Sequence, residues 1–312
     1  MTASSPAPAP APRPCAPLTC SFYAGLLCAG LLLPFLCPPS IHANALQRSP
    51  STPSTLSTTP GAPATPASGV IQFKNKVEQA SQVELKFRLH SQEDPAPFQI
   101  EKESFQLVVP KEYNPAEAWG VLVWVDASDN PRLPPGWEQV LATRKLIYVS
   151  ALRSGNPRDI FDRIRMAVHA NVGMRERFKV DPRRVYVSGF SGGARVASML
   201  GVAWADMFTG AIPFMGVNFY TDISLPNGKV YPPSYIPHED VLEIARKRCR
   251  YVLVTGEKDF NKPETQAVFE HGFQKERFAY TKYLEIPGHG HSTPPAQWLE
   301  AALNLLEPRA SK

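Results

Sequence analysis

Cysteine is scarce in the part of this sequence that can fold. Of the five cysteines in 312 residues, only Cys249 lies beyond residue 45. The chain beyond that point therefore cannot form an internal disulfide, and core packing must stabilise it. Cys249 lies within residues 246–250, where a strand pattern begins, and no motif of a catalytic thiol surrounds it. We expect it to be structural.

Charge is missing from a long N-terminal stretch. No Lys, Arg, Asp or Glu lies between Arg13 and Arg48. Residues 22–33 are apolar, but this run is shorter than the ~20 residues of a membrane-spanning helix and favours the hydrophobic region of a signal peptide. Ala43-Asn44-Ala45 provides a cleavage site before Leu46. We therefore predict a signal peptide over residues 1–45 and a secreted or periplasmic protein, with an uncleaved anchor as the alternative.

Large apolar residues are few between residues 47 and 68, a stretch rich in Ser, Thr, Pro and Ala. Such a stretch has too little apolar surface to bury, so folding would not compensate for the conformational entropy that it would lose. We therefore predict a flexible linker over residues 46–68. The 244 residues from 69 to 312 are enough for one large domain and few for two. The net charge is only +5, which gives no reason to propose a nucleic-acid partner, and we expect no membrane association beyond export.

The rest of the sequence alternates between strand and helix patterns. Apolar and polar residues alternate over 83–89 and 105–109, which predicts two half-buried N-terminal strands. Compact β-branched and aromatic runs, typical of strands buried on both faces, follow at 120–125, 146–150, 184–188, 211–214, 251–255 and 282–286. Helical patterns occupy 159–178, 192–204 and 296–306. The sequence therefore predicts an α/β fold, with a mainly parallel central sheet, antiparallel N-terminal strands and helices on both faces.

A Gly-x-Ser-x-Gly motif lies where one predicted strand turns into a helix. Gly189-Phe190-Ser191-Gly192-Gly193 follows the strand at 184–188 and opens the helix at 192–204, which is the setting that a nucleophilic serine of this motif requires. A Cβ atom at Gly189 or Gly193 would collide with the neighbouring strand or helix. The Gly192 N–H at the helix N-terminus points at a developing oxyanion. A phosphate-binding loop is disfavoured, because neither G-x-G-x-x-G nor a glycine followed by Lys-Ser/Thr is present.

The residues before this motif carry a family resemblance. Residues 181–186, Asp-Pro-Arg-Arg-Val-Tyr, run into Gly189-Phe190-Ser191-Gly192-Gly193. This segment resembles secreted esterases of the α/β-hydrolase superfamily, of the polyhydroxybutyrate-depolymerase and feruloyl-esterase type. The resemblance covers about residues 105–305 and is strongest around Ser191. It implies an α/β-hydrolase fold and a catalytic triad in the chain order Ser, Asp, His.

Carried over by residue, the resemblance implies Ser191 as nucleophile, Asp259 as the acid after a late strand, and a C-terminal histidine as base. Glu257 is a rival for the acid, and Asp222 is a remoter one. His289 and His291 are both available as the base, and we favour His291. Only His291 is followed closely by a small residue and proline, as in these esterases, and it lies farther beyond the strand end. No third ligand stands at a matching spacing from the two histidines, so we expect neither a metal nor a cofactor.

The oxyanion loop departs from the family pattern. The family commonly has His-Gly after the strand at 120–125, whereas this chain has Asp126-Ala127. We expect the backbone of Ala127 or Ser128 to supply the second donor beside Gly192. Aromatic residues near segments that flank the site either line an acyl or aryl pocket or pack in the core. They are Trp137, Phe190, Phe219 and Tyr220.

These features predict a secreted serine hydrolase that cleaves small or polymeric carboxylic esters through an acyl-enzyme. Two alternatives remain open from the sequence. The first is a catalytically inactive α/β-hydrolase-like domain that binds a ligand at the cell surface, which the Asp126-Ala127 departure favours. The second is a serine peptidase on the same fold.

Overall fold

The computed structural model describes residues 67–307. The predicted signal peptide (1–45) and nearly all of the predicted linker (46–68) lie outside this part, so both remain predictions. Ser68, the last linker residue, is joined to the domain: its Oγ accepts from Val109 N–H at 2.9 Å and donates to Val109 O at 3.2 Å. Within residues 67–307, no helix has both the length and the apolar character needed to cross a membrane.

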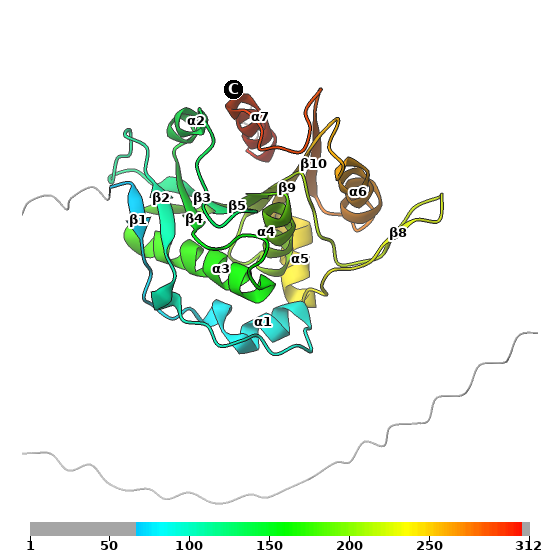
Figure 1. Cartoon of the computed structure of the whole chain (residues 1–312), viewed down its shortest axis with the longest axis horizontal. Helices are drawn as coiled ribbons and strands as arrows, with labels where there is room; N and C mark the ends of the chain where they lie inside the picture. The colour runs from blue at the N-terminus through cyan, green and yellow to red at the C-terminus, as the bar shows by residue number, and fades with distance from the viewer. Residues whose placement is uncertain (1–66, 308–312) are drawn as a thin grey trace, which may run out of the picture. The chain divides into compact units, whose positions relative to one another are not determined.

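Within the same residues, eight strands form one sheet in the order β1-β2-β4-β3-β5-β6-β9-β10, and β7 and β8 form a small second sheet (Figure 1). The strands are β1 (Gly69–Ile71), β2 (Phe105–Val108), β3 (Trp119–Val125), β4 (Leu146–Ala151), β5 (Val180–Phe190), β6 (Gly210–Phe214), β7 (Ile223–Ser224), β8 (Val230–Tyr231), β9 (Arg250–Gly256) and β10 (Tyr280–Ile286). Strand β2 pairs antiparallel with β1 and β4, and the other neighbours in the large sheet are parallel. This confirms the predicted mainly parallel sheet with antiparallel N-terminal strands.

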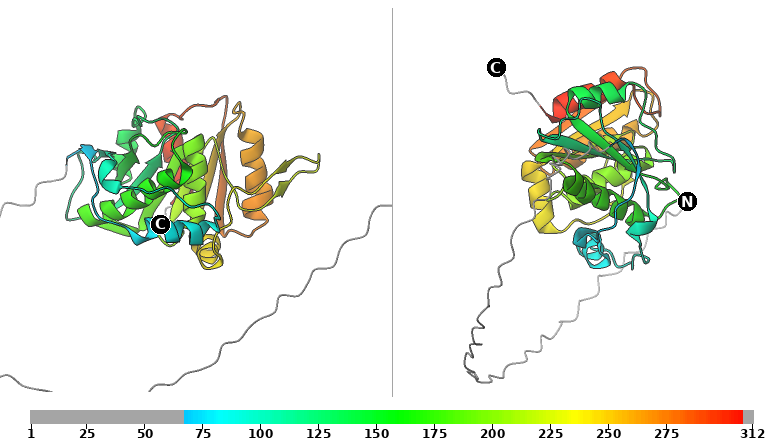
Figure 2. Two further views of the ribbon diagram at one scale, coloured as in Figure 1. Left: turned by 60° about the horizontal axis from the view of Figure 1, so that its bottom comes forward. Right: turned by 90° about the vertical axis from the view of Figure 1, so that its left-hand side faces the viewer.

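Helices cover both faces of the large sheet, as predicted. They are α1 (Gln82–Leu89), α2 (Trp137–Thr143), α3 (Ile160–Arg177), α4 (Gly192–Ala203), α5 (Glu239–Arg248), α6 (Lys262–Ala267) and α7 (Ala296–Leu306), with the short turns η1 (Glu78–Ala80) and η2 (Ile100–Lys102) and the π-helical η3 (Val268–Gln274). Helices α3, α4 and α5 lie on one face, with α1 outside them, and α2 and α7 lie on the other (Figures 1 and 2). Each face has its own apolar core.

The alternating residues 83–89 form helix α1, so the strand predicted there is wrong. Ser81 caps the helix by accepting Glu84 N–H on its Oγ at 3.2 Å, which is the Ser-x-x-Glu pattern of a capping box. Leu85 and Leu89, four residues apart, are buried, whereas Val83 is 73% exposed. A half-buried strand would have buried all of these residues together, so helical spacing determines which ones reach the core.

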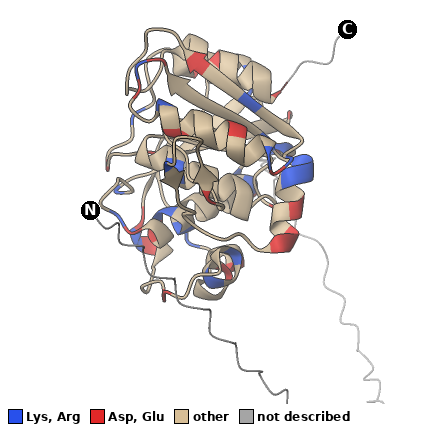
Figure 3. Ribbon diagram, turned by 90° about the vertical axis from the view of Figure 1, so that its right-hand side faces the viewer, with Lys and Arg blue, Asp and Glu red and all other residues tan. Residues whose placement is uncertain are grey.

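Charged residues are distributed without a dominant sign. Lys/Arg and Asp/Glu positions are interspersed along the helices seen in Figure 3. Many of them form ion pairs close in sequence, such as Lys247 with Glu243 one helical turn apart. Exposed pairs of this kind contribute about 0.3–0.5 kcal/mol each, so the two apolar cores hold the fold together and the surface charges add little.

The carboxyl ends of β3, β4, β5, β6, β9 and β10 meet at one edge of the sheet, because these strands are parallel. The chain changes direction in the sheet at β3, which has β4 on one side and β5 on the other. Loops that leave neighbouring strands in opposite directions open a crevice, and ligands of α/β proteins bind at such a point. Ser191 follows β5 and Asp126 follows β3, so this crevice is the place to look for a site.

Candidate active site

Ser191 stands on a strained turn between β5 and α4. Its backbone has φ 54° and ψ −118°, a conformation that L-residues rarely adopt and that costs of order 1–3 kcal/mol. Ser191 N–H donates to Phe214 O at 2.9 Å, which ties the turn to the end of β6. Because α4 begins at the next residue, the serine side chain sits at the helix N-terminus, where the helix dipole favours negative charge.

The glycines around Ser191 allow this turn to approach strand β3. A Cβ on Gly193 would lie 2.0 Å from Val125 O, and one on Gly189 would lie 2.5 Å from the same oxygen. Real Cβ atoms do not come so close to backbone, so larger residues would push the turn away from β3. The predicted need for glycine at both positions is confirmed.

His291 lies between Ser191 and Asp259. Its Nε2 is 2.8 Å from Ser191 Oγ, and its Nδ1 is 2.8 Å from Asp259 Oδ1. With the ring proton on Nδ1, the hydroxyl donates to the imidazole and the imidazole donates to the carboxylate. Such a chain can remove the hydroxyl proton and stabilise the imidazolium that results. The three residues come from the loops after β5, β9 and β10.

The Asp259 carboxylate is buried, and both of its oxygens accept hydrogen bonds. Besides His291, its Oδ1 accepts Asn261 N–H at 2.9 Å, and its Oδ2 accepts the Thr255 hydroxyl at 3.2 Å. Asn261 also donates its amide to Met215 O at 2.8 Å, which joins this loop to the end of β6. The carboxylate is therefore held in one orientation, and the imidazole with it.

The rival residues take other positions. Glu257 accepts Gly288 N–H on its carboxylate at 2.6 Å, and Asp222 is exposed just before β7. The His289 ring turns back on its own loop, with Nε2 2.9 Å from Ser292 O. Its carbonyl accepts Lys258 N–H at 2.8 Å. His289 and Glu257 thus brace the two loops that carry His291 and Asp259.

Two backbone N–H groups are available near Ser191. Among residues 67–307, neither the Gly192 nor the Ala127 N–H has a hydrogen-bond acceptor. Ser128 differs from expectation: its N–H and its hydroxyl both donate to Asp126 Oδ1 at 2.8 Å. The Ser128 N–H is therefore occupied, contrary to the expectation that it is available as a donor, whereas the Ala127 N–H remains available.

The structure buries three of the four aromatic residues that we considered as pocket residues. Trp137 is 0% exposed, packs edge-on against Trp124, and donates its indole N–H to Pro294 O at 3.1 Å. Phe219 and Tyr220 are buried too, and the Phe219 ring packs at a tilt against Phe273, with 4.9 Å between ring centroids. These three residues belong to the two apolar cores of the domain.

Aromatic surface at the site comes from two other rings. Phe190, the fourth candidate, is half-buried, and its ring centroid lies 5.0 Å from that of His291. Phe260 lies 4.1 Å from the same imidazole and is 72% exposed. The sequence analysis missed Phe260, although its position next to Asp259 was a usable signal. The imidazole is thus flanked by two apolar rings that a substrate can reach.

The other candidate chemistries find no support in the part of the chain that the structure describes. Burial raises the pKa of the Cys249 thiol to about 12, and Sγ donates to Ala205 O and Phe208 O. The thiol is structural, as expected. Across residues 67–307, no group of three or more His, Cys, Asp or Glu side chains is arranged to hold a metal ion.

No family model matches this chain, and no curated protein matches it in sequence. Solved structures resemble it at low identity. Est1E from Butyrivibrio proteoclasticus is 16% identical, with a TM-score of 0.45 over 65% of this chain and 91% of that one. An esterase from the planctomycete Thermogutta terrifontis is 17% identical, with a TM-score of 0.46 over 65% and 85% of the two chains.

Dipeptidyl peptidase 4 of Porphyromonas gingivalis is also similar, at 15% identity and a TM-score of 0.47. The match covers 65% of this chain and 33% of that protein, so this chain spans about a third of its length. The mainly parallel eight-stranded sheet, with a serine on the strand–turn–helix after β5, is the α/β-hydrolase fold predicted from the sequence.

Proposed function

We propose that this protein is a serine esterase that cleaves carboxylic esters through an acyl-enzyme. The observation that carries the proposal is the unbroken chain from Asp259 through His291 to Ser191, with 2.8 Å at both contacts, beside two unpaired N–H groups. Binding-only domains have no need of a strained serine held against a base. The arrangement therefore supports a catalyst over the inactive alternative.

In the proposed reaction, Ser191 Oγ attacks the ester carbonyl carbon while His291 Nε2 takes the hydroxyl proton. The Gly192 and Ala127 N–H groups stabilise the oxyanion of the tetrahedral intermediate. The intermediate collapses by breaking the bond to the alcohol oxygen, and His291 gives its proton to the departing alcohol. Water then attacks the acyl-enzyme with His291 again as base, which releases the acid and restores Ser191.

Phe190 and Phe260 support an ester with an apolar group next to the scissile bond. Both rings flank His291, the residue that exchanges protons with the leaving group, and Phe260 is largely exposed. Burying apolar surface contributes about 25 cal/mol per Å², so an aryl or alkyl ester gains affinity there that a small acetate ester does not.

We test this function with purified protein, a fluorophosphonate probe, and substrates of graded acyl length that include a feruloyl ester. The wild type is expected to hydrolyse esters faster than peptide amides and to be labelled at Ser191, as located by mass spectrometry. Ser191→Ala should keep its thermal midpoint and lose activity by about 10⁶-fold, since triad residues act as a unit. Ser224→Ala, at an exposed position of β7 away from the triad loops, is the control and should keep its activity.

Two results would redirect the assignment. Faster cleavage of peptide amides than of esters would establish the peptidase alternative. Absence of both labelling and hydrolysis in the folded wild type would establish the binding domain.

Export is a separate part of the proposal, because it depends on the N-terminal sequence alone. N-terminal sequencing of the exported protein is expected to begin at Leu46, and an intact leader in a membrane fraction would identify the anchor instead.

A further inference from the structure

The loops that follow β3 and β4 are joined to each other at the carboxyl edge of the sheet. Asn156 N–H donates to Ala127 O at 2.9 Å, and Arg153 N–H donates to Asp129 O at 2.7 Å. The Asp129 carboxylate also accepts Gly155 N–H at 2.9 Å. Strand β4 neighbours β3 in the sheet, so these bonds set Asn156 beside the loop that offers the Ala127 donor.

Arg163 of α3 fastens both loops from the core side. Its side chain is buried, donates from Nε to Ser154 O at 2.9 Å, and donates from Nη2 to Asp126 O at 2.8 Å. One guanidinium therefore holds the loop after β3 and the loop after β4 at the same time. The backbone of Asn156, which lies in the loop after β4, is therefore held in place by several contacts. Transition-state stabilisation requires groups that are positioned in this way before the reaction.

The Asn156 side chain lies directly against Gly192. A Cβ on Gly192 would be 2.0 Å from Asn156 Oδ1 and 3.0 Å from its Nδ2. Since a carbon–carbon single bond is about 1.5 Å long, both amide atoms lie within ~4.5 Å of the Gly192 Cα. Asn156 is exposed to solvent. Its carboxamide thus stands next to Gly192, whose N–H is proposed to stabilise the oxyanion.

We propose that Asn156 is a catalytic residue, and that its side-chain Nδ2–H donates to the oxyanion together with the Gly192 and Ala127 N–H groups. This inference rests on the proposed serine hydrolase function. The side-chain oxygen and nitrogen exchange places by a half-turn of the amide, so the donor end can face the oxyanion.

The test compares kcat and KM for the preferred ester in the full-length wild type, Asn156→Ala and Asn156→Asp. The backbone bond from Asn156 to Ala127 survives both substitutions, so only the side-chain donor is lost. Removal of one oxyanion donor lowers kcat by about 10²–10³-fold, and we expect a kcat loss of about 10²-fold in Asn156→Ala with KM within about threefold. Asn156→Asp keeps the shape and adds a repelling charge, so its loss should be at least as large.

A second arm uses the contact between Asn156 and Gly192. In Gly192→Ala the new methyl group displaces the Asn156 amide, the flexible partner of the close contact, so kcat falls. In the Asn156→Ala background that amide is gone, and Gly192→Ala should cost at least about tenfold less than it does alone. Asn227→Ala, in the exposed turn between β7 and β8, is the matched control and should leave kcat unchanged.

The outcomes separate this inference from the function on which it rests. An active wild type whose Asn156→Ala and Asn156→Asp variants stay within threefold in kcat overturns the role of Asn156 alone. A large rise in KM with unchanged kcat also overturns it, because that result describes substrate binding and not oxyanion stabilisation. A folded wild type without esterase activity or fluorophosphonate labelling overturns both proposals. Thermal midpoints of all variants exclude unfolding as the cause of a loss.

Discussion

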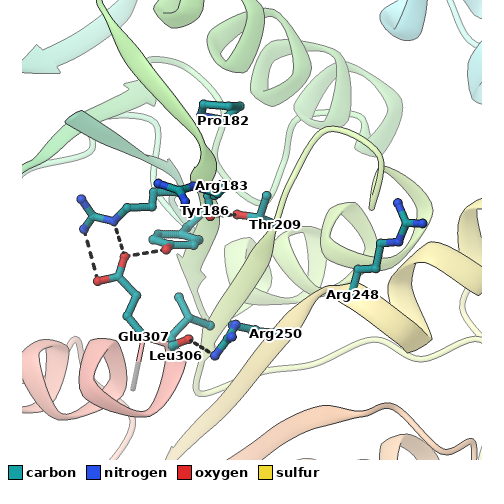
Figure 4. A pocket seen from close by; sticks show the side chains of 9 residues that line it. Pro182, Arg183, Tyr186, Thr209, Arg248, Arg250, Leu306 and Glu307 are labelled. Atoms are coloured by element: carbon teal, nitrogen blue, oxygen red, sulfur yellow. Dashed lines mark hydrogen bonds and ion pairs between the residues drawn. The ribbon is translucent and has the colours of Figure 1, made fainter. Parts of the chain in front are cut away.

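The two edges of the central sheet carry polar groups in opposite states. At the carboxyl edge, Ser191 is strained, its hydroxyl lies 2.8 Å from His291 Nε2, and within residues 67–307 the N–H groups of Gly192 and Ala127 have no acceptor. At the amino edge, Glu307 accepts from Arg184 Nε at 2.7 Å and from Arg184 Nη2 at 3.2 Å. It also accepts from the Tyr186 hydroxyl (Figure 4). A cavity of about 660 Å³ opens beside this second group. This cavity thus lies where the polar groups already satisfy one another.

This difference shows that the hydrogen-bonding state of the polar groups distinguishes the two edges of the sheet. The pairs at the amino edge join the end of α7 to the start of β5, so their role is to hold a helix in place. Gly192 and Ala127 at the carboxyl edge are half-buried, so their N–H groups are accessible to a ligand or, in the proposed reaction, to an oxyanion. Four experiments test this difference between the two edges of the sheet.

The largest effect is expected from the two histidines of one loop. His291→Ala should lower kcat by ~10³-fold or more, because no other base contacts Ser191. His289→Ala should cost less than ~30-fold, because its ring bonds only to Ser292 and supports the loop. Steady-state kinetics of both variants decide the matter. The reverse ranking would assign the base to His289.

The nucleophiles of the two edges should respond oppositely to unfolding. Cys249 precedes β9 at the amino edge, and because its pKa is raised to about 12, the folded protein at pH 8 holds about 10³-fold less thiolate than the unfolded chain. Iodoacetamide should modify Cys249 at least ~100-fold faster in denaturant, as followed by peptide mass spectrometry. Fluorophosphonate should label Ser191 only in the folded state. Similar alkylation rates in both states would show that the amino edge opens.

Breaking the amino-edge group should reduce stability and spare the chemistry. Glu307→Gln removes the charge that Arg184 pairs with and should cost about 1–3 kcal/mol in the free energy of unfolding. Glu300→Gln, on an exposed position of α7, is the control with an expected change below ~0.5 kcal/mol. Urea denaturation measures both. A kcat that changes more than twofold in Glu307→Gln would show that the two edges are coupled.

The smallest effect is expected from the exposed ring at the site. Phe260→Ala should raise KM for an aryl or long-chain ester by about 3–10-fold and change KM for an acetate ester less, because it removes apolar surface next to His291. Ile236→Ala removes a comparably exposed apolar residue elsewhere and should leave KM unchanged. An equal effect on short and long esters would place Phe260 outside the substrate contact.

Prediction from the sequence succeeded where the signal was local or followed from strand order. The turn at Ser191 has its glycines, its strand and its helix within a dozen residues, so its conformation could be foreseen. Residues 83–89 were misread, because alternating apolar residues fit both a strand and a short helix, and the Ser81 cap that decides between them was overlooked. The aromatic residues failed for another reason. Trp137 and Phe219 are enclosed by elements distant in sequence, which no local pattern reports.

By itself, the sequence determined the α/β class, the place of the strained turn at Ser191 and the order of the residues proposed to act there. Backbone sterics and side-chain periodicity act over a few residues, and they are sufficient for these features. Only the tertiary structure decided which side chains meet. Asn156 reaches Gly192 because β4 neighbours β3, and Phe260 reaches His291 because the loops after β9 and β10 share an edge. Contacts between loops from different strands depend on the register of the whole sheet, which no single segment encodes.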